Sequence, residues 1–309
     1  MDFLKKEIID LKEKRGAAIM AHYYQIPEIQ DIADYIGDSL ALARIAATLP
    51  NEVIVMCGVH FMGETAKILC PEKIVLEPDS EAGCSLADSC PADEFKKFVD
   101  SHPDYTVISY VNTSAGVKAL TDIVVTSGNA LAIVETFEKD AKIIFGPDRN
   151  LGNYINSLTG RNMILWDGAC HVHEKFSVDK ILDLKKRYPK AEILVHPECT
   201  APVRLLADKT GSTAVLLDYA RKSDSKEFIV ATESGILHQM CKECPDKTFI
   251  PAPPSDSVCS CNECAYMKLN TLEKLRDCLK NMAPSIEIEK AIAERARRPI
   301  ERMLELSSK

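Results

Sequence analysis

The sequence lacks the features that mark membrane, nucleic-acid-binding and secreted proteins. No apolar run approaches the ~20 residues of a membrane span. The formal net charge is −8, and residues of both signs are mixed along the chain rather than gathered into a basic patch. Because nucleic acids and membrane surfaces bind concentrated Lys and Arg, we expect neither as a partner.

We do not expect the first residues to be a secretion signal. The first residues, MDFLKKEIIDLKEKRG, alternate lysines and acids at helical spacing, which predicts a solvated helix rather than a signal peptide. With 46% hydrophobic and 27% charged residues, the 309-residue chain can bury substantial cores. We therefore expect a soluble, cytoplasmic protein of two or three domains.

Cysteine, in contrast, is abundant, with twelve in the chain. In a reducing compartment, many cysteines usually indicate a metal, an iron–sulfur cluster or buried thiols rather than disulfides. Cys57 lies in a strand-like run, and Cys70 and Cys278 lie within or at the end of helical patterns. These three are expected to be plain buried thiols.

The C-terminal segment SVCSCNECAYMK holds three cysteines within six positions but no histidine and no fourth cysteine: Cys259, Cys261 and Cys264. Paired CxxC patterns are typical of zinc sites, so this segment could share a zinc ion with Cys241 and Cys244 of CKEC. The last two cysteines of the segment could instead form a redox disulfide. On a third interpretation, Cys241 and Cys244 are surface thiols at the end of a helix.

Short β-branched runs alternate with amphipathic helical stretches such as residues 38–49 and 177–188. Apolar runs without alternation, separated by helices, are typical of parallel strands covered on both faces, which is α/β architecture. Two further helices are expected at 271–282 and 285–306. The expected strands are residues 17–24, 52–58, 73–79, 105–112, 141–148, 162–168, 191–198, 227–234 and 248–254.

These patterns recur along the chain. His22, Tyr110 and His196 stand at strand ends and are separated by 88 and 86 residues. Two further sets follow nearly the same period: helix starts at Ser39, Ser127 and Ser212, and strand ends at Gly58, Gly146 and Thr232. A last set consists of loops with Cys84, Cys170 and Cys264, in which Cys170 follows after 86 residues and Cys264 after 94, in a longer loop. A period of this length suits a small α/β domain rather than a solenoid unit.

We predict three similar α/β/α domains with parallel sheets, in residues 1–88, 89–174 and 175–268. A C-terminal helical tail, 269–309, is expected to pack back on them. Ligands of open parallel sheets bind beyond the carboxyl ends of the strands. Three such ends could therefore converge on one site, each giving one cysteine.

Seven segments occur in a characteristic order: AHYYQIPEIQDIADYIGDS, YVNTSA, VVTSGNA, IFGPDRNLG, GACHVH, VHPEC and GST. In this order and spacing they resemble the quinolinate synthases, the oxygen-sensitive iron–sulfur enzymes of de novo NAD biosynthesis. The resemblance covers nearly the whole chain. It implies three α/β domains in a pseudo-threefold arrangement around a central cluster, which agrees with the repeat.

The resemblance further implies a [4Fe–4S] cluster bound by Cys84, Cys170 and Cys264. Cys259 or Cys261 is the alternative to Cys264. Four thiolates normally saturate such a cluster, so three leave one iron open, which favours substrate binding over electron transfer. Two other cysteines match no ligand position of the family: Cys90 and Cys199.

Quinolinate synthases condense iminoaspartate with dihydroxyacetone phosphate and release phosphate and water. The reaction needs donors for carboxylates and a phosphate, together with acid–base groups for enolisation and dehydration. Because iminoaspartate is unstable, L-aspartate oxidase is implied as its source and functional partner. The class implied is a transferase.

The resemblance implies roles for a set of residues at strand ends and helix starts. Catalytic roles fall on Tyr24, Tyr110, Glu198, His22 and His196, with Glu198 as the first choice for a general base. Substrate binding is implied for His22, Ser39, Tyr110, Val111, Asn112, Ser127, His173, His196, Pro197, Glu198, Ser212 and Thr213. His171 departs from the family pattern and is expected to be peripheral. Structural roles also suit these residue types, since hydroxyl side chains at helix starts are common N-caps.

Two other functions remain open from the residues alone. An aconitase-like hydro-lyase would use the same open iron on a hydroxy acid. A zinc- or cluster-bearing interaction protein would keep its metal in air and would not respond to small anions. Formation of quinolinate from the two substrates separates the first alternative from the implied reaction.

Overall fold

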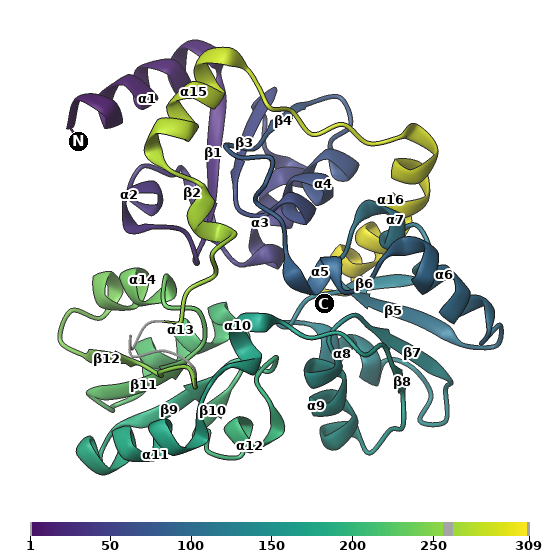
Figure 1. Ribbon diagram of the computed structural model, residues 1–309. Helices are drawn as coiled ribbons and strands as arrows, with labels where there is room; N and C mark the ends of the chain where they lie inside the picture. The colour runs from purple at the N-terminus through teal and green to yellow at the C-terminus, as the bar shows by residue number, and fades with distance from the viewer. Residues whose placement is uncertain (1, 256–261, 308–309) are drawn as a thin grey trace.

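The computed structural model describes residues 2–255 and 262–307. In that part of the chain, twelve strands form three parallel four-stranded sheets, which lie as three lobes around a common centre (Figure 1). The strands are β1 (Ala17–His22), β2 (Tyr35–Gly37), β3 (Val53–Cys57), β4 (Ile74–Leu76), β5 (Thr106–Tyr110), β6 (Ile123–Val125), β7 (Ile143–Gly146), β8 (Ile164–Leu165), β9 (Glu192–Val195), β10 (Lys209–Thr210), β11 (Glu227–Ala231) and β12 (Thr248–Pro251).

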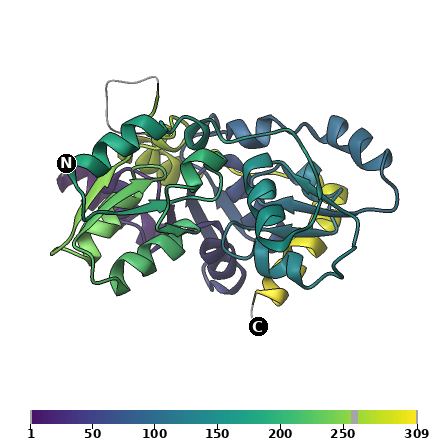
Figure 2. The ribbon, with the colours of Figure 1, turned by 90° about the horizontal axis from the view of Figure 1, so that it is seen from below.

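Helices follow most of the strands and flank the sheets, and the molecule is broader than it is thick (Figure 2). They are α1 (Asp2–Arg15), α2 (Pro27–Gln30), α3 (Ser39–Thr48), α4 (His60–Leu69), α5 (Ser85–Asp88), α6 (Ala92–Asp100), α7 (Ala115–Lys118), α8 (Ala130–Glu135), α9 (Arg149–Thr159), α10 (His171–Glu174), α11 (Val178–Arg187), α12 (Ala201–Arg204), α13 (Thr213–Lys222), α14 (Ile236–Glu243), η1 (Met267–Leu269), α15 (Leu272–Asn281) and α16 (Lys290–Leu306).

The predicted fold class is confirmed. The three sheets have the same strand order, β2-β1-β3-β4, β6-β5-β7-β8 and β10-β9-β11-β12, and helices complete the C-terminal part. Each sheet lies inside one of the predicted ranges 1–88, 89–174 and 175–268, whose limits stay a prediction. We call the three sheet-bearing units the first, second and third repeats.

The inner strands are largely apolar and buried, as the sequence predicts for parallel strands covered on both faces. All residues of β1 and β3 are buried, and so are those of β7. The strand at one edge of each sheet was not expected from the sequence. These edge strands, β2, β6 and β10, are only two or three residues long.

An aspartate repeats in the same place in all three sheets. Asp34, Asp122 and Asp208 each accept a hydrogen bond from a backbone amide of the adjacent inner strand, at 2.8 Å in every case. Their backbone amides donate to the carbonyl of that same strand residue. The aspartates therefore fix the path of the chain into each edge strand, and their spacing follows the period of the repeat.

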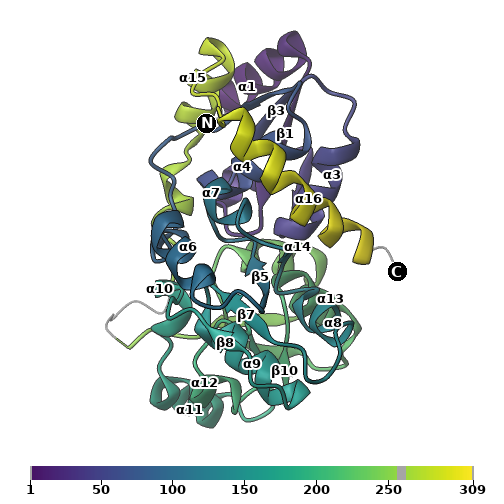
Figure 3. The ribbon, with the colours of Figure 1, turned by 90° about the vertical axis from the view of Figure 1, so that its right-hand side faces the viewer.

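The apolar cores divide the molecule unequally. One core combines the inner residues of the first and second repeats, including Ile54 and Ile108, whereas the third repeat has two cores of its own. Helix α16 completes the shared core with Ile300 and crosses α4 and α7 (Figure 3). Helix α15 packs on α1, whose Ile8 is buried, so α1 is solvated on one face only.

Among residues 2–255 and 262–307, no helix has the length and apolarity that crossing a membrane requires.

Candidate active site

The carboxyl ends of strands from all three repeats meet at a pocket of about 720 Å³. Most of the residues proposed from the sequence line it: His22, Tyr24, Ser39, Cys84, Tyr110, Asn112, Ser127, Cys170, His173, His196, Glu198, Thr213 and Cys264. Three others, Val111, Pro197 and Ser212, are not among its lining residues. The convergence predicted from the repeat therefore brings together residues up to 242 positions apart, from His22 to Cys264.

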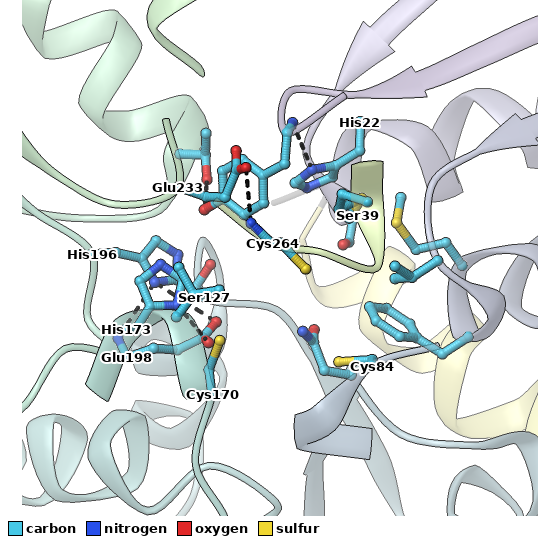
Figure 4. A pocket seen from close by; sticks show the side chains of 18 of the residues that line it. His22, Ser39, Cys84, Ser127, Cys170, His173, His196, Glu198, Glu233 and Cys264 are labelled. Atoms are coloured by element: carbon cyan, nitrogen blue, oxygen red, sulfur yellow. Dashed lines mark hydrogen bonds and ion pairs between the residues drawn. The ribbon is translucent and has the colours of Figure 1, made fainter. Parts of the chain in front are cut away.

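One cysteine from each repeat or its following loop faces the pocket. Cys84 and Cys170 immediately precede the short helices α5 and α10, and Cys264 lies just before η1. Their sulfur atoms point into the space between the repeats (Figure 4). All three are free thiols, and each is partly exposed.

Burial governs the protonation of these three thiols. Burial raises the pKa of Cys84 to about 12, with the neighbouring Cys264 adding to the effect. Burial also raises the pKa of Cys170 and of Cys264. Thiols with such pKa values stay protonated at neutral pH unless a bound cation displaces the proton, which metal coordination does. Because the three sulfurs face one space, they form a donor set that fits thiolate ligation once a cation displaces their protons.

A hydrogen-bonded network built on Glu198 forms another wall of the pocket. The Tyr110 hydroxyl donates to Glu198 Oε1 at 2.5 Å, and His173 Nδ1 lies 3.1 Å from Glu198 Oε2. His173 Nε2 is 3.0 Å from the Thr232 hydroxyl, which also bonds the Tyr24 hydroxyl at 2.7 Å. The network joins side chains of all three repeats.

The network has a definite charge at neutral pH. Burial raises the pKa of Glu198, but His173, whose Nδ1 lies 3.1 Å from Oε2, and the Tyr110 hydroxyl outweigh it and hold the pKa below its usual value. Burial raises the pKa of Tyr24 and Tyr110 well above the usual value. Glu198 is therefore an ionised acceptor, and both tyrosines keep their protons.

Two histidines at equivalent strand ends share one local structure. The amide of Tyr24 donates to His22 Nδ1 at 3.1 Å, and the amide of Glu198 donates to His196 Nδ1 at 3.4 Å. Burial lowers the pKa of both histidines to about 3, with Lys268 assisting at His22 and His173 at His196. Both rings are therefore neutral, and each carries its proton on Nε2, where it can donate to a ligand.

The helix starts divide into caps and pocket residues. Ser212 caps α13 by accepting from the amide of Val215, and it does not line the pocket. The cap of α3 is Asp38, not Ser39, and Ser127 lies two residues before Asn129, which precedes α8. The hydroxyls of Ser39 and Ser127 are thus not needed as caps.

One polar atom of the pocket has no partner. The side-chain oxygen of Asn112 is buried and forms no hydrogen bond with any described residue. A buried acceptor without a donor is unfavourable by about 1–3 kcal/mol. The atom therefore marks a position where a ligand can donate a hydrogen bond.

Comparisons with known proteins agree with this geometry. The family model described as quinolinate synthetase A protein matches residues 6–305. The chain belongs to the quinolinate synthase family. A quinolinate synthase of Chloroherpeton thalassium is 58% identical over 304 residues, covering 98% of this chain and 94% of the relative. Those of Thermosynechococcus vestitus and of a Nostoc species are each 57% identical, over 97% of this chain and 94% and 93% of theirs.

The other cysteines of this quinolinate synthase family member have varied surroundings. Cys57, Cys70 and Cys278 are buried, as predicted. Cys241 is exposed, but Cys244, at the C-terminal end of α14, is buried, so its assignment as a surface thiol was wrong. Two further buried thiols, Cys90 and Cys199, do not line the pocket, whereas Cys259 and Cys261 lie outside the described residues.

Two findings differ from the sequence-based expectation for the CHVH segment. His171 is not peripheral, since it lines the pocket and its Nδ1 bonds the Ser85 hydroxyl at 2.5 Å. The group of described residues able to hold a single metal ion is Cys170, His173 and Glu198, whose ligand atoms lie within 4.8 Å of one another. Two cysteines of the zinc alternative, Cys259 and Cys261, lie outside the described residues.

The sequence reasoning missed Glu233, which is fully buried and lines the pocket. Its Oε1 accepts from the amide of Cys264 at 3.1 Å and pairs with Lys268 Nζ at 2.9 Å. Glu233 directly follows Thr232, a landmark of the repeat. Its position at a strand end was the signal that could have identified it.

Proposed function

We propose that this chain is a transferase that condenses iminoaspartate with dihydroxyacetone phosphate to form quinolinate, phosphate and water. The observation that carries the proposal is the convergence of three cysteines, one from each repeat region, on a pocket with neutral histidine donors and an ionised carboxylate. A binding module would need the cysteines alone. Membership of the quinolinate synthase family supports the same reaction.

We propose that Cys84, Cys170 and Cys264 hold a [4Fe–4S] cluster with one iron not ligated by the protein. When bound, the cluster supplies a Lewis acid to the pocket. The sulfurs face a common space, and no other cysteine among the described residues lines it. An electron carrier would gain nothing from a missing fourth thiolate.

The polar lining suits two anionic substrates. His22 and His196 can each donate from Nε2 to a carboxylate or phosphate oxygen without a charge of their own. The hydroxyls of Ser39, Ser127 and Thr213 lie near helix starts, where backbone amides also favour anions. Further proposed substrate-binding residues are Tyr110, Val111, Asn112, His173, Pro197, Glu198 and Ser212, of which Val111, Pro197 and Ser212 would act from behind the lining.

Proton transfer is assigned to the network around Glu198. The ionised carboxylate can accept a proton during enolisation, and Tyr110, already bonded to it at 2.5 Å, can pass that proton on. Tyr24 is held by the hydroxyls of Thr213 and Thr232 at 2.9 and 2.7 Å, which leaves its ring fixed beside His22. The partnerless oxygen of Asn112 can accept from a substrate N–H or hydroxyl.

The substrate requires a neighbouring reaction. Iminoaspartate hydrolyses readily, so L-aspartate oxidase is the proposed source, as a functional partner without implied contact. A cytoplasmic location is proposed because the cysteines in the described residues are free thiols, which a reducing compartment preserves.

The test is an anaerobic assay of the purified chain with dihydroxyacetone phosphate and an enzymatic source of iminoaspartate. Quinolinate, identified by mass, is the expected product, and omission of either substrate should abolish it. Absence of quinolinate together with dehydration of a simple hydroxy acid would instead identify a hydro-lyase. Metal that survives in air with neither activity would favour the interaction protein.

A further inference from the structure

The loops that carry the three pocket cysteines are held in the same way. In each repeat, a backbone amide that follows the third strand donates to the carbonyl of the residue two positions before the cysteine. The three bonds run from His60 to Ala82 at 2.7 Å, from Arg149 to Gly168 at 2.8 Å and from Ser234 to Asn262 at 3.2 Å. The shared bond fixes how each loop approaches the pocket.

Two of the three loops have an additional tie, made by a carboxylate. Asp148 Oδ2 accepts from the amide of Cys170 at 3.3 Å, and Glu233 Oε1 accepts from the amide of Cys264 at 3.1 Å. Both carboxylates follow the third strand of their sheet, and both are fully buried. Among the described residues, no carboxylate accepts from the amide of Cys84.

The second oxygen of each carboxylate is also occupied. Asp148 Oδ1 accepts from the amide of Leu151 at 2.7 Å, and Glu233 Oε2 accepts from the amide of Gly235 at 2.7 Å. Capping of α9 needs only the bond from the Leu151 amide to Asp148, and a single hydroxyl or amide oxygen could accept that bond equally well. The demand for two acceptor oxygens therefore comes from the cysteine amide.

Glu233 also contacts Lys268, which links it to the first repeat. Lys268 Nζ lies 2.9 Å from Glu233 Oε1 and donates to the Tyr24 carbonyl at 2.7 Å. The carboxylate thus connects the Cys264 loop with the turn that carries Tyr24. Removing one partner of a buried ion pair leaves an uncompensated charge, so loss of either Glu233 or Lys268 should disturb this connection.

We propose that Asp148 and Glu233 are positioning residues that hold Cys170 and Cys264 in the conformation in which they bind the metal cluster. The inference rests on the proposed function for the identity of the cluster. The hydrogen bonds direct the two cysteine backbones, whereas no carboxylate in the described part of the chain accepts from the amide of Cys84. Groups that orient metal ligands typically change metal affinity or activity by about 10–100-fold when removed.

Isosteric amides provide a selective test because an amide has only one oxygen that can accept. Asp148→Asn and Glu233→Gln keep the shape of the side chain but leave one backbone amide facing an NH₂ group. Asp208→Asn is the matched control, since it alters a carboxylate that also accepts a strand amide, at 2.8 Å, but lies outside the pocket lining. Asp148→Ser is a second variant that can cap α9 yet is too short to reach Cys170.

The first measurement uses the anaerobically prepared holoenzyme and follows loss of iron to a chelator. We expect loss about 10-fold faster for Asp148→Asn and Glu233→Gln than for wild type, and an unchanged rate for Asp208→Asn. The second measurement alkylates the cluster-free full chain and reads each cysteine by peptide mass spectrometry. Alkylation should rise about 10-fold at Cys170 in the first variant and at Cys264 in the second, with Cys84 unchanged in both.

Equal acceleration at all three cysteines would mean general loosening and would overturn the inference, as would wild-type rates in both measurements. The alkylation does not need a cluster. If wild type binds no iron, the proposed cofactor fails, and the site-resolved alkylation still decides whether the carboxylates position the cysteines.

Discussion

The contact between the first and second repeats differs in kind from the contacts of the third. The first two repeats share one apolar core, which Ile300 of α16 completes. The third repeat keeps separate cores and meets the first through polar groups such as Gln30 and Gln239, 2.9 Å apart, with Tyr23 and Tyr24 as its apolar neighbours. We infer that the shared apolar core mainly stabilises the molecule, whereas the polar contacts of the third repeat mainly shape the pocket.

Apolar burial is proportional to area and tolerates small shifts, whereas hydrogen bonds require defined positions. The shared core should therefore account for stability without specifying the pocket. The polar contacts of the third repeat position Glu198 and Glu233, so they should affect activity more than unfolding. Substitutions in the two regions can test this division.

The largest effect is expected at Glu198. Glu198→Gln removes the ionised acceptor of the Tyr110 hydroxyl and should lower turnover by about 10²–10⁴-fold, the usual contribution of acid–base catalysis. Thermal unfolding and the absorption spectrum of the holoenzyme should change little. Glu192→Gln on β9, outside the pocket, is the matched control, and undiminished quinolinate formation by Glu198→Gln would remove Glu198 from the mechanism.

The shared core should respond in the opposite way. Ile300→Ala deletes a fully buried side chain and should lower the free energy of unfolding by about 2–5 kcal/mol. Denaturant unfolding measures the loss, and KM at a temperature where the variant is folded should stay close to that of wild type. Leu205, which is 86% exposed, offers the control Leu205→Ala. A larger effect on KM than on unfolding would contradict the division.

An intermediate effect is expected at the polar contact of the first and third repeats. Gln30 Nε2 donates to the carbonyls of Tyr23, Gln25 and Gly235 at 2.8–3.0 Å. Gln30→Leu leaves these acceptors without that donor and should be destabilising by about 1–3 kcal/mol. Because Tyr23 adjoins Tyr24, KM should rise as well, unlike in Ile300→Ala. Lys242→Ala at the exposed rim of the same contact is the control, and an unchanged KM in Gln30→Leu would count against the account.

The smallest effect concerns a polar contact that solvent screens. His60 Nδ1 lies 3.0 Å from Glu77 Oε2, and this hydrogen bond raises the pKa of His60, although burial opposes it. A raised pKa in the folded state stabilises the folded protein. This contribution is fully present below the unfolded pKa of about 6.5 and is lost as the pH rises through the folded pKa. His60 is 47% exposed, so the difference in unfolding free energy between wild type and His60→Gln should be below about 1 kcal/mol. It should be larger at pH 5.5 than at pH 8.5; the reverse order would contradict the assignment.

Most of the fold could be predicted from the sequence because the inner strands are mainly apolar runs, which can be recognised from their own residues without knowing which strand they pair with. The edge strands β2, β6 and β10 could not be found in that way. They pair over only two or three residues, and the adjacent inner strand determines their extent. The repeated Asp34, Asp122 and Asp208 carried a signal with the right period, but nothing in the residue type distinguished them from solvated acids.

The pocket was predictable where the period placed chemistry at strand ends, as at His22, Tyr110 and His196. Asp148 and Glu233 escaped because loop carboxylates are normally exposed, and their burial depends on how the three repeats pack together. Cys244 shows the same limit, since its helix gave no sign of which side would be covered. Ser212 caps α13, because its hydroxyl accepts from the amide of Val215 in its own helix.

The central claim is that one cysteine from each of three separate chain regions holds the cluster. It is tested most directly by anaerobic purification of Cys84→Ser, Cys170→Ser and Cys264→Ser, with Cys241→Ser and Cys199→Ser as controls. Iron and sulfide would be quantified and quinolinate assayed. Each of the first three variants should lose the intact cluster and quinolinate formation, and both controls should keep them. Full iron and sulfide in Cys264→Ser would contradict the account.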